Sequence, residues 1–286
     1  MNSGGVMKDF LVLSDGAPDD EARFACAEAL ARRFEGFVSA VVAAELPAIP
    51  AMVAAEPAGF IPPDDGLRQA AIERANQVKA KVARRFANHA SPVPVFQVTE
   101  MPEFLGAGVA SLARTSDLFV TTLPADGSES PILDSVLDEL LLDGCCGVLG
   151  LPLGLTCDAS FPTITVAWNH SREASRAVAR AMPLIQQARS VNVVLVDQPL
   201  RRAGDARRPS DDVIDHLKHH GISASLSRVA REQLRTSEAI LAEAGRMGSD
   251  LLVMGAPAEG GLLQWFRGSV SREVLAASSV PLFMAH

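Results

Sequence analysis

The chain has 286 residues, 48% of them hydrophobic and four of them cysteine, so a disordered chain and a small disulfide-stapled scaffold are both excluded. No apolar run reaches the roughly 18 residues of a membrane helix, and the first residues lack the features of a signal segment, so we expect a cytoplasmic protein without membrane contact. Residues 1–157 hold 11 Lys and Arg against 21 Asp and Glu, and residues 158–286 hold 15 against 13, which argues against a nucleic-acid platform and makes the second half the better host for an anion.

In chain order, apolar strand patterns alternate with helical patterns through the first half. The first strand is stopped after Leu13, and Gly36 ends the helix that follows, whose acidic residues lie near its start and basic residues near its end. Residues 47–63 hold five prolines and cannot form a regular element. We predict strands at 10–13, 37–44, 93–98, 117–122 and 146–151, and helices at 18–33, 65–90, 103–114 and 131–142.

The second half repeats this order of elements. We predict strands at 163–168, 191–196, 222–229, 250–254 and 280–285, and helices at 172–189, 211–220, 237–247 and 269–277. The amino-acid sequence of residues 116–120 is also repeated, nearly unchanged, at residues 249–253. We therefore predict a duplicated unit, with a first domain over 6–155, which carries the proline-rich insertion 47–63, and a second domain over 160–286.

This alternation indicates an α/β fold with two tandem five-stranded, mostly parallel sheets and helices on both faces. Such sheets bind ligands beyond the carboxyl ends of their strands, at the switch point in strand order. The candidate sites are therefore the turns after Leu13, Thr122, Trp168 and Met254.

The turn after Met254 carries the strongest binding pattern. Gly255 directly follows the strand, where a glycine lets backbone amides approach a ligand closely. Gly268 and Ser269 open the last helix, where free N–H groups and the helix dipole favour an anion. A loop and a helix cap without any ligand would leave the same pattern, so both interpretations stay open.

Three parts of the chain resemble the universal stress protein family in its tandem two-domain form. They are residues 268–275 with the strand after them, and the strand–turn segments 11–16 and 165–171. The resemblance implies an adenine nucleotide alpha hydrolase-like fold. Nucleotide-binding members of that family carry G-x2-G-x9-G-[ST], and this chain has Ala258, preceded by Pro257, at the second glycine. The residues implied to bind nucleotide are Ala167, Trp168, Asn169, Met254, Gly255, Ala258, Gly268, Ser269, Val270 and Ser271.

Each half departs from the family pattern in a different way. Asn169 replaces the adenine-contacting Asp of the family, and Trp168 beside it either stacks on a base or fills space. The first half keeps Asp15 at that position, but residues 122–126 replace the glycine loop, so this half is not expected to bind a triphosphate. The resemblance also implies that the two halves pair through their last strands as an internal pseudo-dimer, and a homodimer of the whole chain is a further alternative.

Three other patterns have simpler explanations. Gly106 and Gly108 lie inside a helical pattern and predict helix packing. The histidines at 216, 219 and 220 have a spacing that suits a metal, but they occupy the last turn of a helix, where partial positive charge is favourable, so we predict no metal site. The pair 145–146 can oxidise or fill a core, and Cys26 and Cys157 are expected to be reduced core or strand-flanking residues.

We expect a stress-response sensor or adaptor whose second domain binds ATP or another adenine nucleotide, with at most weak ATPase activity, because no catalytic constellation converges on the turns. Two alternatives stay open: a nucleotide-free interaction protein, favoured by the altered glycine loop, and a slow nucleotide hydrolase, which only fold analogy supports. The expected roles are backbone approach for Gly255 and Gly268, phosphate contacts for Ser269 and Ser271, and base contacts for Asn169 and Trp168.

Overall fold

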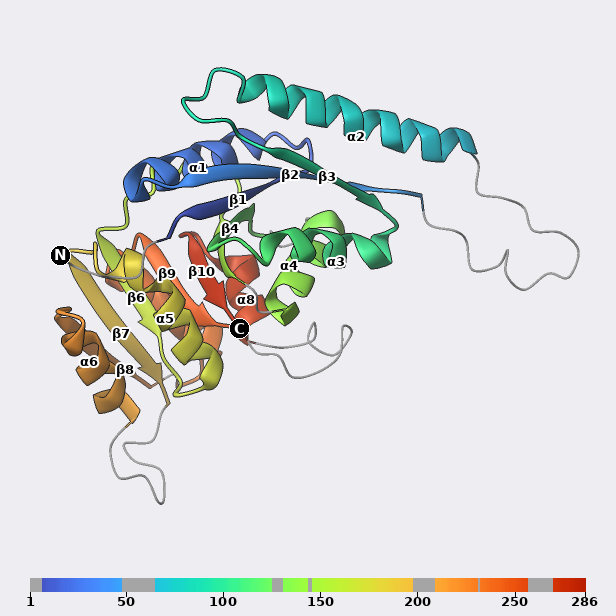
Figure 1. The fold of residues 1–286 in the computed structure, drawn as a ribbon. Coiled ribbons are helices and arrows are strands. Elements are labelled where there is room, and N and C mark those ends of the chain that lie inside the picture. Colours follow the sequence, from blue (N-terminus) through green and yellow to red (C-terminus); the bar gives the residue numbers. More distant parts are fainter. Residues whose placement is uncertain are drawn as a thin grey trace, which may run out of the picture.

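The computed structural model describes residues 7–47, 65–124, 131–143, 146–197, 209–230, 232–256 and 270–286. Ten strands and eight helices alternate in this part of the chain (Figure 1). None of these helices is both long and apolar enough to cross a membrane. The predicted insertion 47–63 lies outside the described residues after Pro47.

The predicted elements are all present, with ends that shift by a few residues. The first half contains β1 (Asp9–Ser14), α1 (Asp20–Phe34), β2 (Phe37–Glu45), α2 (Asp65–Arg85), β3 (Val95–Glu100), α3 (Pro102–Ala113), β4 (Leu118–Thr122), α4 (Pro131–Asp143) and β5 (Gly147–Leu151). The second half contains β6 (Thr163–Ala167), α5 (Arg172–Ile185), β7 (Ser190–Val196), α6 (Pro209–His219), β8 (Ala224–Val229), α7 (Thr236–Arg246), β9 (Leu251–Gly255), α8 (Val270–Ala277) and β10 (Leu282–Ala285). The α5 helix ends earlier than predicted because the N–H groups of Arg189 and Ser190 bond to the carbonyl of Pro162, which starts the next strand.

The strands form one sheet in the order β3-β2-β1-β4-β5-β10-β9-β6-β7-β8. Neighbouring strands are parallel within each half, and the halves meet where β10 pairs antiparallel with β5, with Phe283 opposite Leu149. The predicted pairing through the last strands is confirmed. It merges the two predicted five-stranded sheets into a single ten-stranded sheet.

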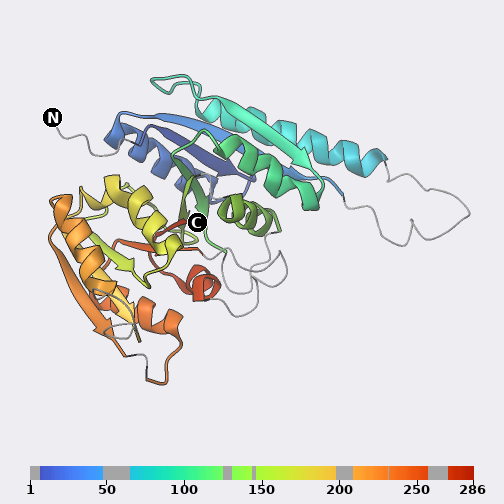
Figure 2. The same cartoon turned by 60° about the horizontal axis from the view of Figure 1, so that its bottom comes forward.

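Helices cover both faces of this sheet (Figures 1 and 2). The buried side chains of α1 and α5 belong to one apolar cluster with Val12 and Val166, and those of α3, α4 and α8 belong to the other with Leu13 and Met254. Both clusters run across the junction between the halves. Because β5 and β10 are antiparallel, the carboxyl ends of the first five strands point to the opposite edge of the sheet from those of the second five. The switch point of the first half and that of the second half therefore lie on opposite sides of the sheet, each at the carboxyl ends of its own strands.

The end of α1 shows how the chain returns to the sheet. Glu35 adopts a left-handed conformation (φ 52°), and the N–H of Gly36 bonds to the carbonyl of Ala31. A Cβ on Gly36 would lie 2.5 Å from the carbonyl oxygen of Lys8. Gly36 is therefore needed for the close approach of this turn to the start of β1.

Asp138 on α4 is a buried carboxyl near the junction of the halves. Burial raises its pKa to about 7, the nearby Asp134 adds to the increase, and Arg272 of α8 opposes it. Since the ordinary pKa is 3.8, the folded state holds this proton more tightly than the unfolded state. This group therefore makes the free energy of unfolding fall as the pH rises from about 4 to about 7.

We expect Asp138→Asn to raise the free energy of unfolding at about pH 8 by about 2 kcal/mol and to change it little at about pH 4. This is well below the full value of a shift at about 1.36 kcal/mol per pKa unit, because the amide that replaces the carboxyl is also a polar group that is costly to bury. Urea denaturation at both pH values measures the difference. The exposed Glu73→Gln variant is the control, and an equal effect of Asp138→Asn at both pH values would contradict the assignment.

Candidate functional site

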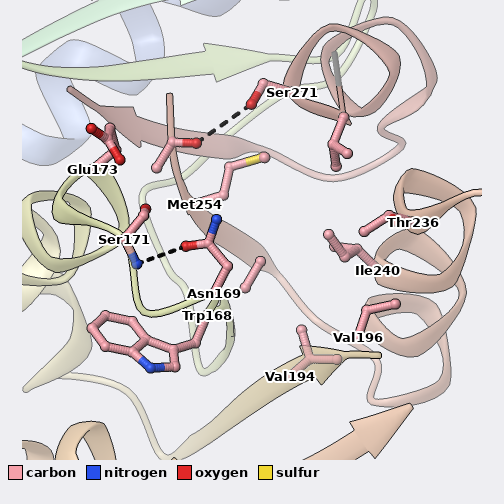
Figure 3. A pocket seen from close by; sticks show the side chains of 13 residues that line it. Trp168, Asn169, Ser171, Glu173, Val194, Val196, Thr236, Ile240, Met254 and Ser271 are labelled. Carbon is pink, nitrogen blue, oxygen red and sulfur yellow. Dashed lines mark hydrogen bonds between the residues drawn. The ribbon is translucent and has the colours of Figure 1, made fainter. Parts of the chain in front are cut away.

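A cavity of about 260 Å³ lies at the carboxyl ends of β6, β7 and β9 (Figure 3). Its other walls come from the beginnings of α5, α7 and α8, and helix beginnings carry free N–H groups and partial positive charge. The cavity is therefore apolar on the strand side and suited to an anionic group on the helix side. Its lining residues are Ala167, Trp168, Asn169, Ser171, Glu173, Val194, Val196, Thr236, Ile240, Met254, Gly255, Val270 and Ser271.

The cavity brings together most of the residues that the sequence singled out, namely Ala167, Trp168, Asn169, Met254, Gly255, Val270 and Ser271. The other three, Ala258, Gly268 and Ser269, lie outside the described residues. The lining residues that sequence reasoning missed are Ser171, Glu173, Val194, Val196, Thr236 and Ile240. Those of β7 and α7 belong to no motif, so only the packing of distant segments identifies them.

Asn169 is held in a fixed orientation by the turn that follows β6. Its Oδ1 accepts a hydrogen bond from the N–H of Ser171 at 3.1 Å, and the Ser171 hydroxyl in turn caps α5 by accepting from the N–H of Ala174 at 3.1 Å. Because Oδ1 is used in the turn, the amide presents Nδ2, which is a donor, on its other side (Figure 3). The residue at this position therefore offers N–H groups where an aspartate would offer only oxygen acceptors.

Gly255 lies where β9 meets the first turn of α5. A Cβ here would lie 2.5 Å from the carbonyl carbon of Glu173 and equally close to the N–H of Ala174, and both are backbone atoms. The sequence predicted a glycine that admits a ligand. In the structure, the same glycine also admits the beginning of α5, which brings the helix end to the cavity.

Trp168 lies between the cavity and the core. It directly follows β6, belongs to the same apolar cluster as Ile164 and Val166 of that strand, and is only 8% exposed. Its ring makes an edge contact with His170, with centroids 6.2 Å apart. This burial favours the space-filling interpretation of Trp168, and the indole remains close enough to the cavity to report on it (Figure 3).

Glu273 connects the two helices that flank the cavity. Its carboxylate accepts a hydrogen bond from the Ser237 hydroxyl of α7 and lies 3.1 Å from Nη1 of Arg235. Arg235 also pairs with Glu238 at 2.8 Å. These contacts keep the beginnings of α7 and α8 together without filling the space between them.

Glu173 places a carboxylate at the cavity. Its pKa is lowered mainly by a hydrogen bond from its own backbone N–H at the start of α5, and further by Ser171, Arg172 and His286. Glu173 is therefore ionised at neutral pH, so part of the partial positive charge at this helix start is already compensated.

The described residues of the first half make close internal contacts around Arg23 and Gly106. Arg23 is 1% exposed and pairs with Asp15 and Asp20, so the aspartate that this half keeps at the family's position is engaged in an ion pair. On the other face, Gly106 of α3 lies directly against the carbonyl of Ser135 in α4. The predicted helix-packing role of Gly106 is confirmed, and these contacts are a physical reason to expect no nucleotide in this half.

The histidines of α6 do not form a metal cluster. His216 and His220 have ring centroids 4.8 Å apart. Burial lowers the pKa of His216, and the neighbouring His220 and His219 lower it further. Throughout the described ranges, no group of three His, Cys, Asp or Glu side chains could hold a metal ion.

Known proteins share this architecture. Residues 160–286 match the model of the Universal stress protein family. The structure is similar to that of a universal stress protein from Archaeoglobus fulgidus DSM 4304, with 15% identity, 97% of each chain covered and a TM-score of 0.70. It is also similar to a putative universal stress protein from Pseudomonas aeruginosa UCBPP-PA14, with 13% identity, 97% of this chain and 92% of the other covered, and a TM-score of 0.57. No curated protein is significantly similar in sequence.

Proposed function

We propose that this chain, whose residues 160–286 match the model of the Universal stress protein family, belongs to that family, binds an adenine nucleotide in the cavity of its second half and acts as a stress sensor or adaptor. The observation that carries the proposal is the convergence of the beginnings of three helices, α5, α7 and α8, on one cavity beside Asn169 and Gly255. A volume of about 260 Å³ is near the lower end of small-molecule pockets, roughly 300–1,000 Å³. It suits a nucleoside, with phosphates extending outward.

The cavity offers separate surfaces for a base and for an anion. Val194, Val196 and Ile240 provide an apolar wall for a flat ring, and Nδ2 of Asn169 can donate to a ring nitrogen of the base. The hydroxyl of Ser271 at the start of α8 can turn from its long 3.5 Å contact with the carbonyl of Gly255 to a phosphate oxygen. Nucleotide binding is better supported than catalysis. Among the described lining residues, Glu173 is the single titratable side chain, so a bound nucleotide would meet no pair of acid and base groups there.

The ionised Glu173 favours one alternative, a nucleotide-free interaction protein. A carboxylate at the cavity repels a triphosphate, and the departures at Pro257 and Ala258 from the glycine pattern also weaken a phosphate loop. Comparing ATP with adenosine separates the two proposals. If the base and ribose supply most of the binding energy, both ligands bind; if the cavity takes no nucleotide, neither does.

We expect Thr236→Phe to weaken adenine nucleotide binding at least tenfold, about 1.4 kcal/mol, because the ring enters the cavity from the first turn of α7. A Trp265→Phe background leaves Trp168 as the only tryptophan, so its fluorescence and calorimetry both measure titrations with ATP, AMP and cyclic AMP. Leu234→Phe, at an exposed position two residues earlier, is the matched control. Unchanged emission and no heat at millimolar nucleotide would rule out the binding proposal.

A further inference from the structure

Two buried cysteines from distant parts of the chain lie together at the junction between the halves. Cys26 comes from α1, and Cys157 comes from the connection 152–162 between β5 and β6. Both side chains belong to the same apolar cluster, and each cysteine is the largest influence on the pKa of the other thiol. The two sulfur atoms are therefore neighbours although 131 positions separate them.

The connection 152–162 is attached along one stripe of α1. The Asp19 side chain, at the helix start, accepts from the N–H of Gly154 at 3.1 Å. Two turns later Cys26 meets Cys157, and after two further turns Nη1 of Arg33 donates to the carbonyl of Ala159 at 2.5 Å. The thiol pair therefore lies between two hydrogen bonds that attach the connection 152–162 to α1 of the first half.

The two thiols are not equivalent. The Cys157 sulfur accepts a hydrogen bond from the backbone N–H of Ala159 at 3.4 Å, and a donor to sulfur stabilises a thiolate. The hydrogen bond to Cys26 lowers the pKa of Cys157, whereas the same bond and burial raise the pKa of Cys26. Cys157 is also the more accessible of the two, at 8% exposed against 0%.

We propose that Cys26 and Cys157 form a reversible disulfide in response to hydroperoxides, with Cys157 reacting first. The Cys157 thiolate attacks a peroxide oxygen, the O–O bond breaks, and the sulfur becomes a sulfenic acid while hydroxide, or the alkoxide of an organic peroxide, leaves. The Cys26 sulfur then attacks the Cys157 sulfur, the S–O bond breaks, and water leaves with the Cys26 proton. In sum, two thiols and hydrogen peroxide yield one disulfide and two waters, and a dithiol reductant reverses the reaction.

The bond would fasten the connection between the halves covalently to α1. A cross-link between residues so far apart restricts the unfolded chain strongly, so oxidation is expected to move the denaturation midpoint upward. Because neither cysteine lines the second-half cavity, this proposal does not depend on nucleotide binding.

The test uses the full chain with Cys145→Ala and Cys146→Ala, which leaves Cys26 and Cys157 as the only cysteines. The protein is treated with hydrogen peroxide, and catalase then removes the excess. It is unfolded in the presence of N-ethylmaleimide, and its intact mass is measured by mass spectrometry. We expect a monomer lighter by the two hydrogens lost, no maleimide adduct and a raised denaturation midpoint, all reversed by dithiothreitol. In the wild-type chain, a linked peptide that contains Cys26 and Cys157 gives the same result without any substitution.

Two single replacements in this background test the order of reaction. With Cys26→Ala, the Cys157 sulfenic acid has no partner and is expected to react with dimedone; with Cys157→Ala, Cys26 is expected to remain a thiol. The proposal is overturned if both thiols still take maleimide after peroxide, if oxygen is added without a link, or if the bond joins two chains.

Discussion

Replacing Arg23 with alanine is expected to lower the free energy of unfolding by about 3–5 kcal/mol, the usual cost of removing one partner of a buried ion pair. The guanidinium group is 1% exposed and pairs with Asp15 and with Oδ1 of Asp20 at 2.6 Å. Asp20 also accepts a hydrogen bond from the hydroxyl of Ser14 at 2.7 Å. Without Arg23, burial would act on these carboxylates with no opposing positive charge, and burial already raises the pKa of Asp20.

Chemical denaturation measures this loss, with Arg114→Ala as the matched control. Arg114 pairs with Asp143 at 2.9 Å, but its side chain is 61% exposed, so we expect a change below about 1 kcal/mol. Replacing the whole cluster by Arg23→Met with Asp15→Asn and Asp20→Asn should recover much of the lost stability, because buried ion pairs contribute little more than packed neutral side chains. A loss at Arg23 no larger than that at Arg114 would show that the buried cluster does not stabilise the first half.

Replacing Gly255 with alanine is expected to weaken nucleotide binding at least tenfold and to lower the free energy of unfolding by about 1–3 kcal/mol. The added Cβ would lie 2.5 Å from the carbonyl carbon of Glu173. The beginning of α5 would have to move away from β9, and Asn169 and Ser171, which are tied to that turn, would move with it.

Gly245→Ala is the matched control for this substitution. Gly245 lies in the last turns of α7 with no atom within 4 Å of a built Cβ. Alanine there is expected to stabilise the protein by up to about 1 kcal/mol and to leave nucleotide affinity unchanged. Calorimetric titration and urea denaturation of both variants separate the two effects. If Gly255→Ala left both affinity and stability unchanged, β9 and α5 would not set the shape of the cavity.

Much of the architecture could be predicted from local patterns. Apolar periodicity and turn residues identified every described strand and helix. The repetition of the sequence of residues 116–120 at residues 249–253 indicated the duplication. The pairing of the last strands followed from the resemblance of the two halves to a known family. Element ends were less accurate, as at α2, which stops at Arg85 rather than at 90, because helix ends depend on where the chain must turn to enter the next strand.

The candidate site was only partly predictable. Asn169 lies just after β6 and Gly255 ends β9, and both could be located from the sequence, because the carboxyl end of a parallel strand is itself a signal. Thr236 and Ile240 carry no such signal, and they line the cavity only because α7 packs across β7. The same holds for Arg23, which the sequence shows as one of two interior charges of an ordinary amphipathic helix.

The sequence by itself therefore determined the α/β class and the order of the elements, because these depend on periodicity and on neighbouring residues. It also predicted a ligand at the carboxyl ends of the strands. Only the tertiary structure decided what lies around the described turns of each half. In the first half, Arg23 meets two carboxylates and Gly106 lets α3 touch α4, whereas in the second half Gly255 admits the start of α5 and a space remains beside it. These outcomes depend on contacts between residues far apart in the chain, and local patterns do not encode such contacts.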